Sequence, residues 1–475
     1  MAPTPAAAGE RQASAPGIAD RVAGLRARYE TGRTGSLKWR LAQLRALRAM
    51  LVENGTAFEE ALWADLRKAP AETQFMEIGF TVAEIDAVAK RLRRWLRPRS
   101  VPVPPALLPA RAATVLEPLG VVAVIAPWNY PIQLLLGPAV GALAAGNALV
   151  LKPSELAPAT SAALARLVPR YLDHDAVTVV EGGVPETTEL LAQRLDHIFY
   201  TGNGAVGRIV LEAAAKHITH VTLELGGKSP TYVDDTVDID AAASRIVWGR
   251  FLNAGQTCVA PDYVLATREV QARLGPALAR WTERYFGADP SRSPDYGRIV
   301  NERHFARLSG LLGAGTTIVG GQTDAASRYL APTVLADVPR DAPVMGEEIF
   351  GPILPLVTVD GLDDALRFIT AHDKPLALYV FSEDATTRRR FLRETSSGAV
   401  GFGIPLAHLS VHGLPFGGVG PSGTGAYHGR RSVEVFSHEK AVLSKPLKPD
   451  TMQLVSPPYT AAREGFIRRM LGRIS

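Results

Sequence analysis

The sequence predicts an α/β fold with two parallel-sheet domains, and two observations support this prediction. Five short apolar runs follow one another, each separated from the next by enough residues for a helix; they are Val121–Ile125, Asn147–Leu151, Val177–Val180, His197–Tyr200 and Val221–Leu223. A second set lies between Pro230 and about Val400, and it includes Tyr263–Leu265, Leu354–Val357 and Leu376–Phe381. Short buried strands that alternate with helices are typical of a parallel sheet covered on both faces.

The length and composition allow a large core. The chain has 475 residues, of which 47% are hydrophobic and 21% charged, so we expect two or three packed domains and no wholesale disorder. No stretch reaches the roughly 18 uninterrupted apolar residues that a membrane helix needs, so no integral membrane segment is expected. A single cysteine fits a reducing compartment, and we expect a cytoplasmic protein. The formal net charge of +5 favours anionic ligands such as nucleotides.

The N-terminal part predicts a disordered arm followed by helices. Residues 1–17 are rich in Ala, Pro and Ser, which indicates a disordered arm and not a signal peptide. Leucines recur at helical spacing before Asn54-Gly55, and Thr56 with Glu59 predicts a capping box for the next helix. A third helix has an arginine-rich tail between Arg91 and Arg99. Because no aromatic residues interleave with these arginines, the tail indicates a solvated helix face, and no nucleic-acid partner is expected.

A glycine-rich turn predicts a nucleotide site. Residues Gly202-Asn203-Gly204-Ala205-Val206-Gly207 satisfy the pattern G-x-G-x-x-G between a predicted strand and a predicted helix. Such glycines let the backbone approach a pyrophosphate, and the helix N-terminus favours negative charge. A tight turn without a ligand is the structural alternative. The same fingerprint places an acid on the ribose about 20 residues further on, where Glu224 stands. Lys228 does not belong to a Walker loop, since the first glycine of that motif would fall on Thr222.

Four other residues each allow two interpretations. Cys258 is either a core filler or a nucleophile. Asn129 follows the first predicted strand, where it is either a turn residue or an amide donor for developing charge. Lys152 and Glu155 follow the second strand, where they either hold ribose hydroxyls or form an exposed turn.

Together, these motifs resemble the aldehyde dehydrogenases, in particular their class 3 branch. Seven blocks occur in the family's order between about Gly35 and Ala441; they are Pro127–Pro131, Leu151–Glu155, Gly202–Gly207, Leu223–Pro230, Gly255–Cys258, Glu347–Pro352 and Pro415–Gly418. The stretches Gly182–Leu190 and Gly425–Gly429 are similar to class 3 specifically. The resemblance implies an aldehyde dehydrogenase-like fold, in which a small β arm for bridging and oligomerisation joins the two α/β domains. It also implies NAD(P)-dependent oxidation of an aldehyde to a carboxylate.

The resemblance assigns three catalytic roles. Cys258 would be the nucleophile, which forms a thiohemiacetal and then an acyl thioester. The Asn129 side chain and the Cys258 backbone N–H would form the oxyanion hole. Glu224 would be the base that activates water. This role replaces the assignment of Glu224 to the ribose that the glycine pattern alone suggests. We expect donors or the positive ring of the cofactor to lower the pKa of the thiol, and burial to raise that of the base.

The resemblance also assigns the cofactor, which is NAD with NADP as a second candidate. The residues expected to bind it are Trp128, Lys152, Glu155, Gly202, Asn203, Gly204, Gly207, Glu348 and Phe350. Lys152 and Glu155 would hold the adenosine ribose, Glu348 the nicotinamide ribose, and Phe350 would pack beside nicotinamide. The charge of Glu155 should oppose a 2′-phosphate. Gly204 departs from the Thr or Ser of many relatives, and no metal site is expected.

The implied organisation has four parts. We expect a disordered arm at 1–17, a Rossmann-like dinucleotide-binding domain at 18–225 with a bridging segment at 98–112, a catalytic domain at 226–420, and a bridging segment and tail at 421–475. The resemblance further implies a homodimer that acts on a small-molecule aldehyde. Two alternatives stay open: an enzyme that transfers the acyl group to coenzyme A, and a catalytically silent nucleotide-binding protein.

Overall fold

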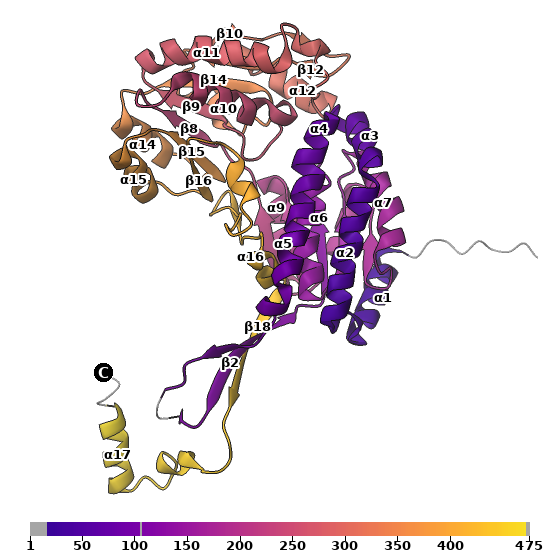
Figure 1. The fold of residues 1–475 in the computed structure, drawn as a ribbon, viewed down its shortest axis with the longest axis vertical. Helices are drawn as coiled ribbons and strands as arrows, with labels where there is room; N and C mark the ends of the chain where they lie inside the picture. Colours follow the sequence, from indigo (N-terminus) through magenta and orange to yellow (C-terminus); the bar gives the residue numbers. More distant parts are fainter. Residues whose placement is uncertain (1–16, 105–106, 472–475) are drawn as a thin grey trace, which may run out of the picture.

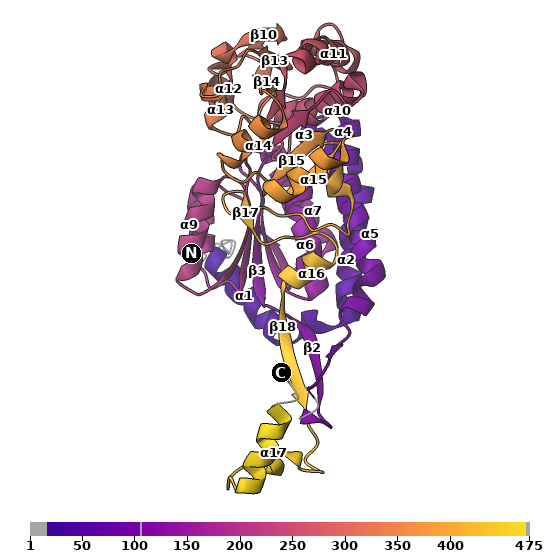
Figure 2. The ribbon, with the colours of Figure 1, turned by 90° about the vertical axis from the view of Figure 1, so that its left-hand side faces the viewer.

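The computed structural model describes residues 17–104 and 107–471, which form two sheet-centred bodies and a projecting arm (Figures 1 and 2). The first body holds a six-stranded sheet and the second a seven-stranded sheet. The arm is a three-stranded sheet that extends away from the first body. This α/β architecture confirms the predicted fold class. The predicted disordered arm at 1–17 lies outside the described residues, except for Gly17.

The first sheet has the strand order β17-β7-β6-β3-β4-β5. Its strands are β3 (Val121–Ile125), β4 (Ala148–Lys152), β5 (Val177–Val179), β6 (His197–Thr201), β7 (His220–Glu224) and β17 (Gly423–Thr424). The first five are parallel and coincide with the five predicted runs, whereas β17 pairs antiparallel with β7. The five predicted strands are therefore confirmed.

Helices cover both faces of this sheet, which is why its central strands β3 and β4 are almost entirely apolar. The helices that follow strands are α6 (Gln133–Ala145), α7 (Pro158–Tyr171), α8 (Val184–Leu191) and α9 (Gly204–Ala215). Along β3, Val122 and Val124 join the core cluster that contains α6, whereas Val121 and Ala123 join the cluster that contains α1 (Ile18–Glu30). Successive side chains of a strand point to opposite faces, so both faces need apolar residues.

The chain order of the strands creates a switch point beside β3. From β3 the chain proceeds outward to β4 and β5, and it then crosses to β6 and β7 on the other side. Ligands of open α/β sheets bind at such a point, beyond the carboxyl ends of the strands. The turn after β3 carries Asn129, and the turn after β6 carries Gly202–Gly207. The glycine pattern thus follows the fourth strand in chain order and not the first.

The N-terminal helices pack on the first sheet, and one detail of their prediction is wrong. They are α2 (Leu37–Glu53), α3 (Gly55–Leu66), α4 (Pro70–Glu72), the π-helical segment η2 (Thr73–Gly79) and α5 (Phe80–Trp95). Helix α3 begins at Gly55, so Thr56 lies inside it, and the side chain of its N-cap Asn54 makes no capping hydrogen bond. Glu59 instead accepts a hydrogen bond of 2.5 Å from Gln74. The predicted capping box is therefore absent.

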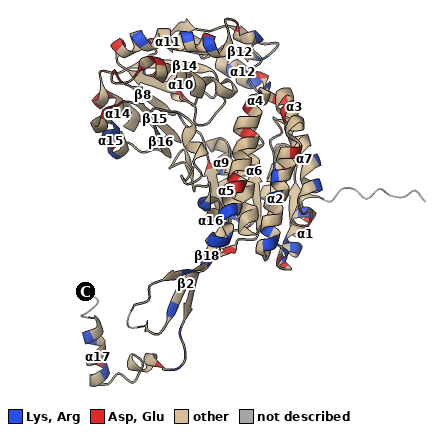
Figure 3. Cartoon of the chain, in the orientation of Figure 1, with Lys and Arg blue, Asp and Glu red and all other residues tan. Residues whose placement is uncertain are grey.

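The second sheet has the order β10-β13-β14-β9-β8-β15-β16, and only the edge strand β10 runs antiparallel to its neighbour. Its strands are β8 (Pro230–Val233), β9 (Tyr263–Ala266), β10 (Thr316–Val319), β13 (Thr333–Ala336), β14 (Ile353–Thr358), β15 (Ala377–Phe381) and β16 (Ala399–Phe402). The longer helices around it are α10 (Ile239–Phe251), α11 (Arg268–Phe286), α14 (Leu362–Thr370) and α15 (Ala385–Glu394). Basic and acidic residues are mixed along α11 and α1 (Figure 3).

The arm joins segments from both halves of the chain. It contains β1 (Arg99–Val101), β2 (Arg111–Pro118) and β18 (Ser437–Ser444), and β2 and β18 pair antiparallel over eight residues. The predicted C-terminal segment therefore divides, because β17 joins the first sheet and α16 (Arg430–Val435) packs on α6. Helix α17 (Ala461–Leu471) follows the arm. Within 17–104 and 107–471, no helix is long and apolar enough to cross a membrane.

Candidate active site

The turn that carries Cys258 has a constrained backbone. It follows the short helix η4 (Leu252–Gly255), in which Asn253 and Ala254 have φ of 51° and Gly255 has φ of 74°. A Cβ at Gly255 would lie 2.3 Å from the Gly351 carbonyl oxygen, so only glycine fits there. The Gln256 side chain donates 3.0 Å hydrogen bonds to the carbonyls of Asn253 and Arg298. These contacts hold the backbone just before the thiol in one conformation.

Asn129 lies against this turn. Its Nδ2 donates a 3.0 Å hydrogen bond to the Gln256 carbonyl, while its own carbonyl accepts 2.8 Å bonds from Lys68 Nζ and Asn253 Nδ2. The acceptor at Gln256 identifies Nδ2 and fixes the orientation of the amide. An amide NH2 has two N–H groups, so one remains for a ligand. Asn129 is 1% exposed and its Oδ1 has no partner among the described residues.

Glu224 is a buried carboxylate at the end of β7. Its side chain is 2% exposed, and neither oxygen has a hydrogen-bond partner among the described residues. Burial raises the pKa of Glu224 well above its ordinary value, because no donor or cation compensates the lost hydration of its charge. Its backbone is held on both sides, since Gly202 donates to its carbonyl and Gly423 is its partner in β17. A carboxylate with a raised pKa is suited to take up a proton near neutral pH.

Cys258 is partly buried and lies within electrostatic range of two carboxylates. Burial raises the pKa of the thiol, and the charges of Glu348 and Glu224 raise it further, while the backbone amides of Cys258 and Val259 lower it. From the sequence, we expect two sources that lower the pKa of the thiol, which are hydrogen-bond donors and the positive ring of the cofactor. In the protein alone, the effect of the backbone donors is smaller than that of burial and the two carboxylates. A positive charge in this site would oppose both carboxylates and favour the thiolate.

Lys152 and Glu155 lie at the carboxyl end of β4, beside the glycine-rich turn. Lys152 is 2% exposed, and its Nζ donates to the carbonyls of Pro153 (2.8 Å) and Gly182 (2.6 Å). Burial lowers the pKa of Lys152, and the nearby Glu155 opposes this shift. Glu155 itself is exposed. Burial and, to a smaller extent, the charge of Glu155 raise the pKa of Tyr200 to about 12, which places this carboxylate close to the turn after β6.

The glycine-rich turn opens helix α9 as the pattern predicts. Asn203 is the N-cap, and its Oδ1 accepts a 2.9 Å hydrogen bond from Val206 N. A Cβ at Gly202 would lie 2.2 Å from the Tyr200 hydroxyl, and one at Gly207 would lie 3.2 Å from Leu225 Cδ2. A Cβ at Gly204 would meet only a side-chain nitrogen at 3.9 Å, so packing does not require glycine there.

Trp128, Glu348 and Phe350 form a second group of predicted cofactor residues. The Trp128 and Phe350 rings meet edge to face with centroids 5.5 Å apart. Burial, together with the nearby Asp262, raises the pKa of Glu348 to about 8, and its Oε1 is buried without a partner among the described residues. Gly226, Gly227 and Glu348 line a cavity of about 230 Å³. A buried carboxylate oxygen without a partner, beside a cavity, fits a polar ligand such as a nucleotide ribose.

Several residues of the site were not predicted from the sequence. Lys228 forms a 2.6 Å ion pair with Asp262 and donates to the Glu347 carbonyl, so it holds the segment before Glu348. The His304 ring contacts the Trp128 ring in a tilted arrangement, with centroids 5.5 Å apart and an interplanar angle of 51°. The buried Lys68 and Glu77 form a 2.5 Å ion pair beside Asn129. Of these residues, only Lys228 belongs to a recognisable motif. Its neighbours Gly226 and Gly227 were the signal that could have identified it.

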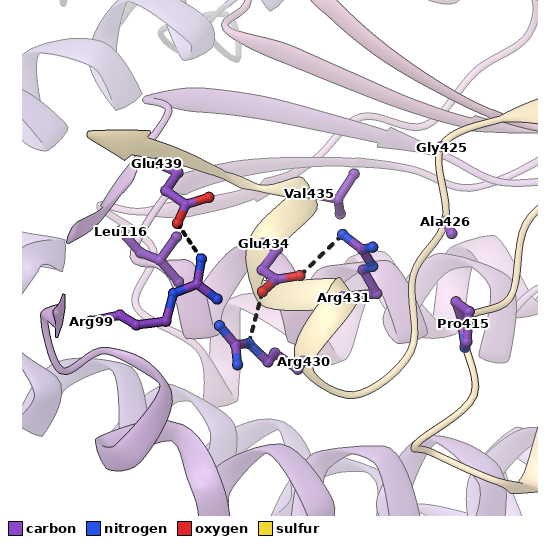
Figure 4. A pocket seen from close by; sticks show the side chains of 10 residues that line it. All are labelled: Arg99, Leu116, Pro415, Gly425, Ala426, Arg430, Arg431, Glu434, Val435 and Glu439. Carbon is purple, nitrogen blue, oxygen red and sulfur yellow. Dashed lines mark hydrogen bonds and ion pairs between the residues drawn. The ribbon is translucent and has the colours of Figure 1, made fainter. Parts of the chain in front are cut away.

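A larger cavity, of about 910 Å³, lies at the base of the arm (Figure 4). Its arginines are paired: Arg99 lies 2.9 Å from Glu439, and Arg430 and Arg431 lie 2.7 Å and 3.2 Å from Glu434. Each of the three arginines is therefore engaged by a carboxylate, although Arg430 and Arg431 share one. Among residues 17–104 and 107–471, no group of three or more potential metal ligands occurs.

Comparisons with known proteins agree on one family. The family model described as "Aldehyde dehydrogenase family" matches residues 11–442. The chain is 49% identical to aldehyde dehydrogenase family 3 member B1 of Rattus norvegicus, over 93% of this chain and 95% of that protein. It is 47% identical to the aldehyde dehydrogenase of Canis lupus familiaris described as dimeric and NADP-preferring, over 91% of this chain and 96% of that protein.

Solved structures show the same fold. The substrate-bound state of Staphylococcus aureus AldH is similar with a TM-score of 0.93 and 40% identity, over 96% of this chain and 99% of that one. A Mycobacterium tuberculosis aldehyde dehydrogenase complexed with NAD+ is similar with a TM-score of 0.80 and 29% identity, over 90% of each chain.

Proposed function

Because the chain belongs to the aldehyde dehydrogenase family, it oxidises aldehydes with NAD or NADP, and we propose that Cys258, Asn129 and Glu224 carry the reaction. One observation supports this assignment above the others. The Asn129 amide is hydrogen-bonded to the turn of Cys258, and the charge of Glu224 raises the pKa of the Cys258 thiol. Both Glu224 oxygens are free of other partners within the described residues.

In the proposed first step, the Cys258 thiolate attacks the aldehyde carbon and forms a thiohemiacetal whose oxygen carries negative charge. The remaining N–H of Asn129 Nδ2 and the Cys258 backbone N–H donate to that oxygen. Preorganised donors of this kind each contribute about 2.7–4 kcal/mol to lowering the barrier. The bound cofactor supplies the acceptor for the hydride that leaves the carbon, and Trp128, Glu348 and Phe350 are the residues that would hold its nicotinamide end.

In the proposed second step, Glu224 removes a proton from the water that hydrolyses the acyl thioester on Cys258. The carboxylate needs a pKa near neutrality for this role, and its burial supplies a shift in that direction. The presence of this base also argues against coenzyme A as the acyl acceptor, since attack by a thiol would not require water to be activated.

Trapping of the acyl-enzyme tests these roles. The Glu224→Gln variant is expected to give a burst of about one NAD(P)H per site and then nearly stop, because hydrolysis is the step it lacks. Mass spectrometry after acid quench should find the acyl group on Cys258, and Cys258→Ala should give neither burst nor adduct. A Glu189→Gln variant, which removes a charge from exposed α8, serves as the control. Full turnover by Glu224→Gln, or turnover that requires coenzyme A in the parent, would contradict the assignment.

For the cofactor, we propose that Lys152 and Glu155 hold the adenosine ribose at the switch point, and that Gly202, Asn203, Gly204 and Gly207 surround the pyrophosphate. The proposal places NAD first, because the exposed Glu155 carboxylate would repel a 2′-phosphate. NADP stays a second candidate, since the relative from Canis lupus familiaris is described as NADP-preferring.

We also propose a homodimer whose two copies meet through the arm. Strand β18 ends the arm sheet and exposes Val442 (41%) and Leu443 (60%), and the relative from Canis lupus familiaris is described as dimeric. Exposed apolar side chains on a sheet edge favour association. Light scattering coupled to gel filtration should give twice the mass of the chain. The Leu443→Lys variant should lower this measured mass toward that of one chain. The lone thiol is consistent with the reducing cytoplasm as the proposed location.

A further inference from the structure

The oxyanion donor Asn129 is held by a buried ion pair that no motif marks. Lys68 lies between α3 and α4, and Glu77 lies in η2; both side chains are fully buried, with Nζ and Oε1 2.5 Å apart. Neither residue is drawn from the family blocks, and the side-chain hydrogen bonds of both go to each other and to the turn between β3 and α6. Buried ion pairs are weak evidence for stability, so this pair needs another explanation.

Lys68 makes two hydrogen bonds and one cation–π contact. Its Nζ donates one to Glu77 Oε1 and one to the Asn129 carbonyl at 2.8 Å, while the ammonium lies 4.0 Å from the centroid of the Tyr130 ring. Both hydrogen bonds and the ring contact of this ammonium therefore go to Glu77 and to the two residues of this turn.

Glu77 fixes the other end of the same turn. Its Oε2 accepts 3.0 Å hydrogen bonds from the backbone N–H groups of Ile132 and Gln133, where helix α6 begins. These amides have no partner within the helix, and almost all of α6 is buried, so water is not available to them. A carboxylate at this position also interacts favourably with the positive end of the helix dipole.

Together the pair holds the whole turn between β3 and α6 from one side, and the Cys258 turn holds it from the other. Asn253 Nδ2 donates to the Asn129 carbonyl, Asn129 Nδ2 donates to the Gln256 carbonyl, and the Tyr130 hydroxyl lies 2.8 Å from Thr257 Oγ1. We propose that Lys68 and Glu77 are positioning residues, which fix the Asn129 backbone so that its side chain faces the oxygen of the substrate. This inference rests on the proposed role of Asn129.

A double-mutant cycle between Lys68→Met and Asn129→Ala tests the proposal with the full-length enzyme. We expect Lys68→Met to lower kcat about 10–100-fold while the KM of the cofactor changes little, because misplaced catalytic groups cost rate more than binding. In the Asn129→Ala background the same substitution should lower kcat less than about twofold. Equal losses in both backgrounds, or no loss in the parent, would overturn the positioning role. Full activity of Asn129→Ala would instead overturn the proposed oxyanion role.

Two further variants separate positioning from folding. Removing one charge of a buried pair leaves the other uncompensated, so Lys68→Met combined with Glu77→Gln is the variant to use if the single variant does not fold. The matched control is Asp65→Asn. Asp65 is also a buried carboxylate that caps a helix, since it accepts from Ala159 N at 3.0 Å and Thr160 N at 2.8 Å at the start of α7. The Asp65→Asn variant should lower the thermal midpoint without coupling to Asn129→Ala in kcat. A coupling as large as that of Lys68→Met would also contradict the proposal.

Discussion

Gly226 faces the carboxylate of Glu348 so closely that a Cβ at position 226 would lie 2.0 Å from Glu348 Oε2. No side chain fits without moving that carboxylate, which is assigned to the nicotinamide ribose. The absence of a side chain at one residue therefore sets the position of a charged group more than a hundred residues away in the chain.

We expect Gly226→Ala to raise the KM of the cofactor about tenfold, since the added methyl displaces the Glu348 carboxylate that is assigned to the nicotinamide ribose. Initial rates over a range of NAD and NADP concentrations measure this. Gly346→Ala is the matched control, because Gly346 lines the same cavity and a Cβ there would have nothing within 4 Å. An unchanged KM in Gly226→Ala would show that Glu348 does not bind the cofactor.

Glu224→Gln is expected to make the protein more stable at neutral pH. The pKa of Glu224 in the folded protein lies well above 4.5, its ordinary value. Below pH 4.5 both the folded and the unfolded chain keep the proton. As the pH rises above that value, the unfolded chain loses the proton first, so the folded state loses stability until its own pKa is reached. The free energy of unfolding of the variant should exceed that of the parent near pH 7, and the difference should shrink as the pH falls toward 4. A constant difference across this range would contradict the assignment of the shift to Glu224.

Alkylation of Cys258 by iodoacetamide should be slow in the cofactor-free protein. Burial and two carboxylates raise the pKa of the thiol, so at about pH 8 the rate should be at least about tenfold lower than for the chain unfolded in guanidinium. Because the chain has one cysteine, the mass of the intact protein reports this thiol alone. NAD should accelerate the reaction more than NADH, since the two differ in the charge of the nicotinamide ring. Equal rates in folded and unfolded protein would disprove the raised pKa.

Glu155→Gln should shift the cofactor preference toward NADP. Removing this exposed negative charge relieves its repulsion of a 2′-phosphate, and we expect kcat/KM for NADP relative to NAD to rise about 3–10-fold, with a larger effect at low salt. Glu189→Gln makes the same change of charge on α8 and should leave the ratio unchanged. If both variants shift the ratio equally, Glu155 has no specific contact with the phosphate.

The sequence predicted the parallel strands well, because burial on both faces leaves a continuous apolar run such as Val121–Ile125. It also predicted that Gly202–Gly207 opens a helix, since the glycines and the cap Asn203 act locally. The capping box at Thr56 was predicted wrongly, because Glu59 is engaged by Gln74, a contact that depends on how η2 packs against α3.

The supports of the site could not be read from the sequence. Lys68 and Glu77 are residue types that usually lie on the surface, and only the packing of α3, η2 and α6 buries them together. The same holds for the direction of the thiol pKa, which depends on the burial of Cys258 and then on the charge of Glu348, a residue 90 positions later in the chain. Motifs in the sequence predict which groups react, whereas the pKa values of those groups depend on how the folded chain buries them and places charges around them.

The pairing of Gly423 with Glu224 has a consequence for synthesis on the ribosome. On the side away from β6, strand β7 is paired only at Leu223 and Glu224, and their partner β17 comes nearly two hundred residues later in the chain. A nascent chain that has already folded its N-terminal half therefore presents an open strand, with unsatisfied backbone groups, while the second half is still being made. Chaperones that shield such an edge would act in that interval, and a product truncated before Gly423 would keep the edge permanently and tend to aggregate.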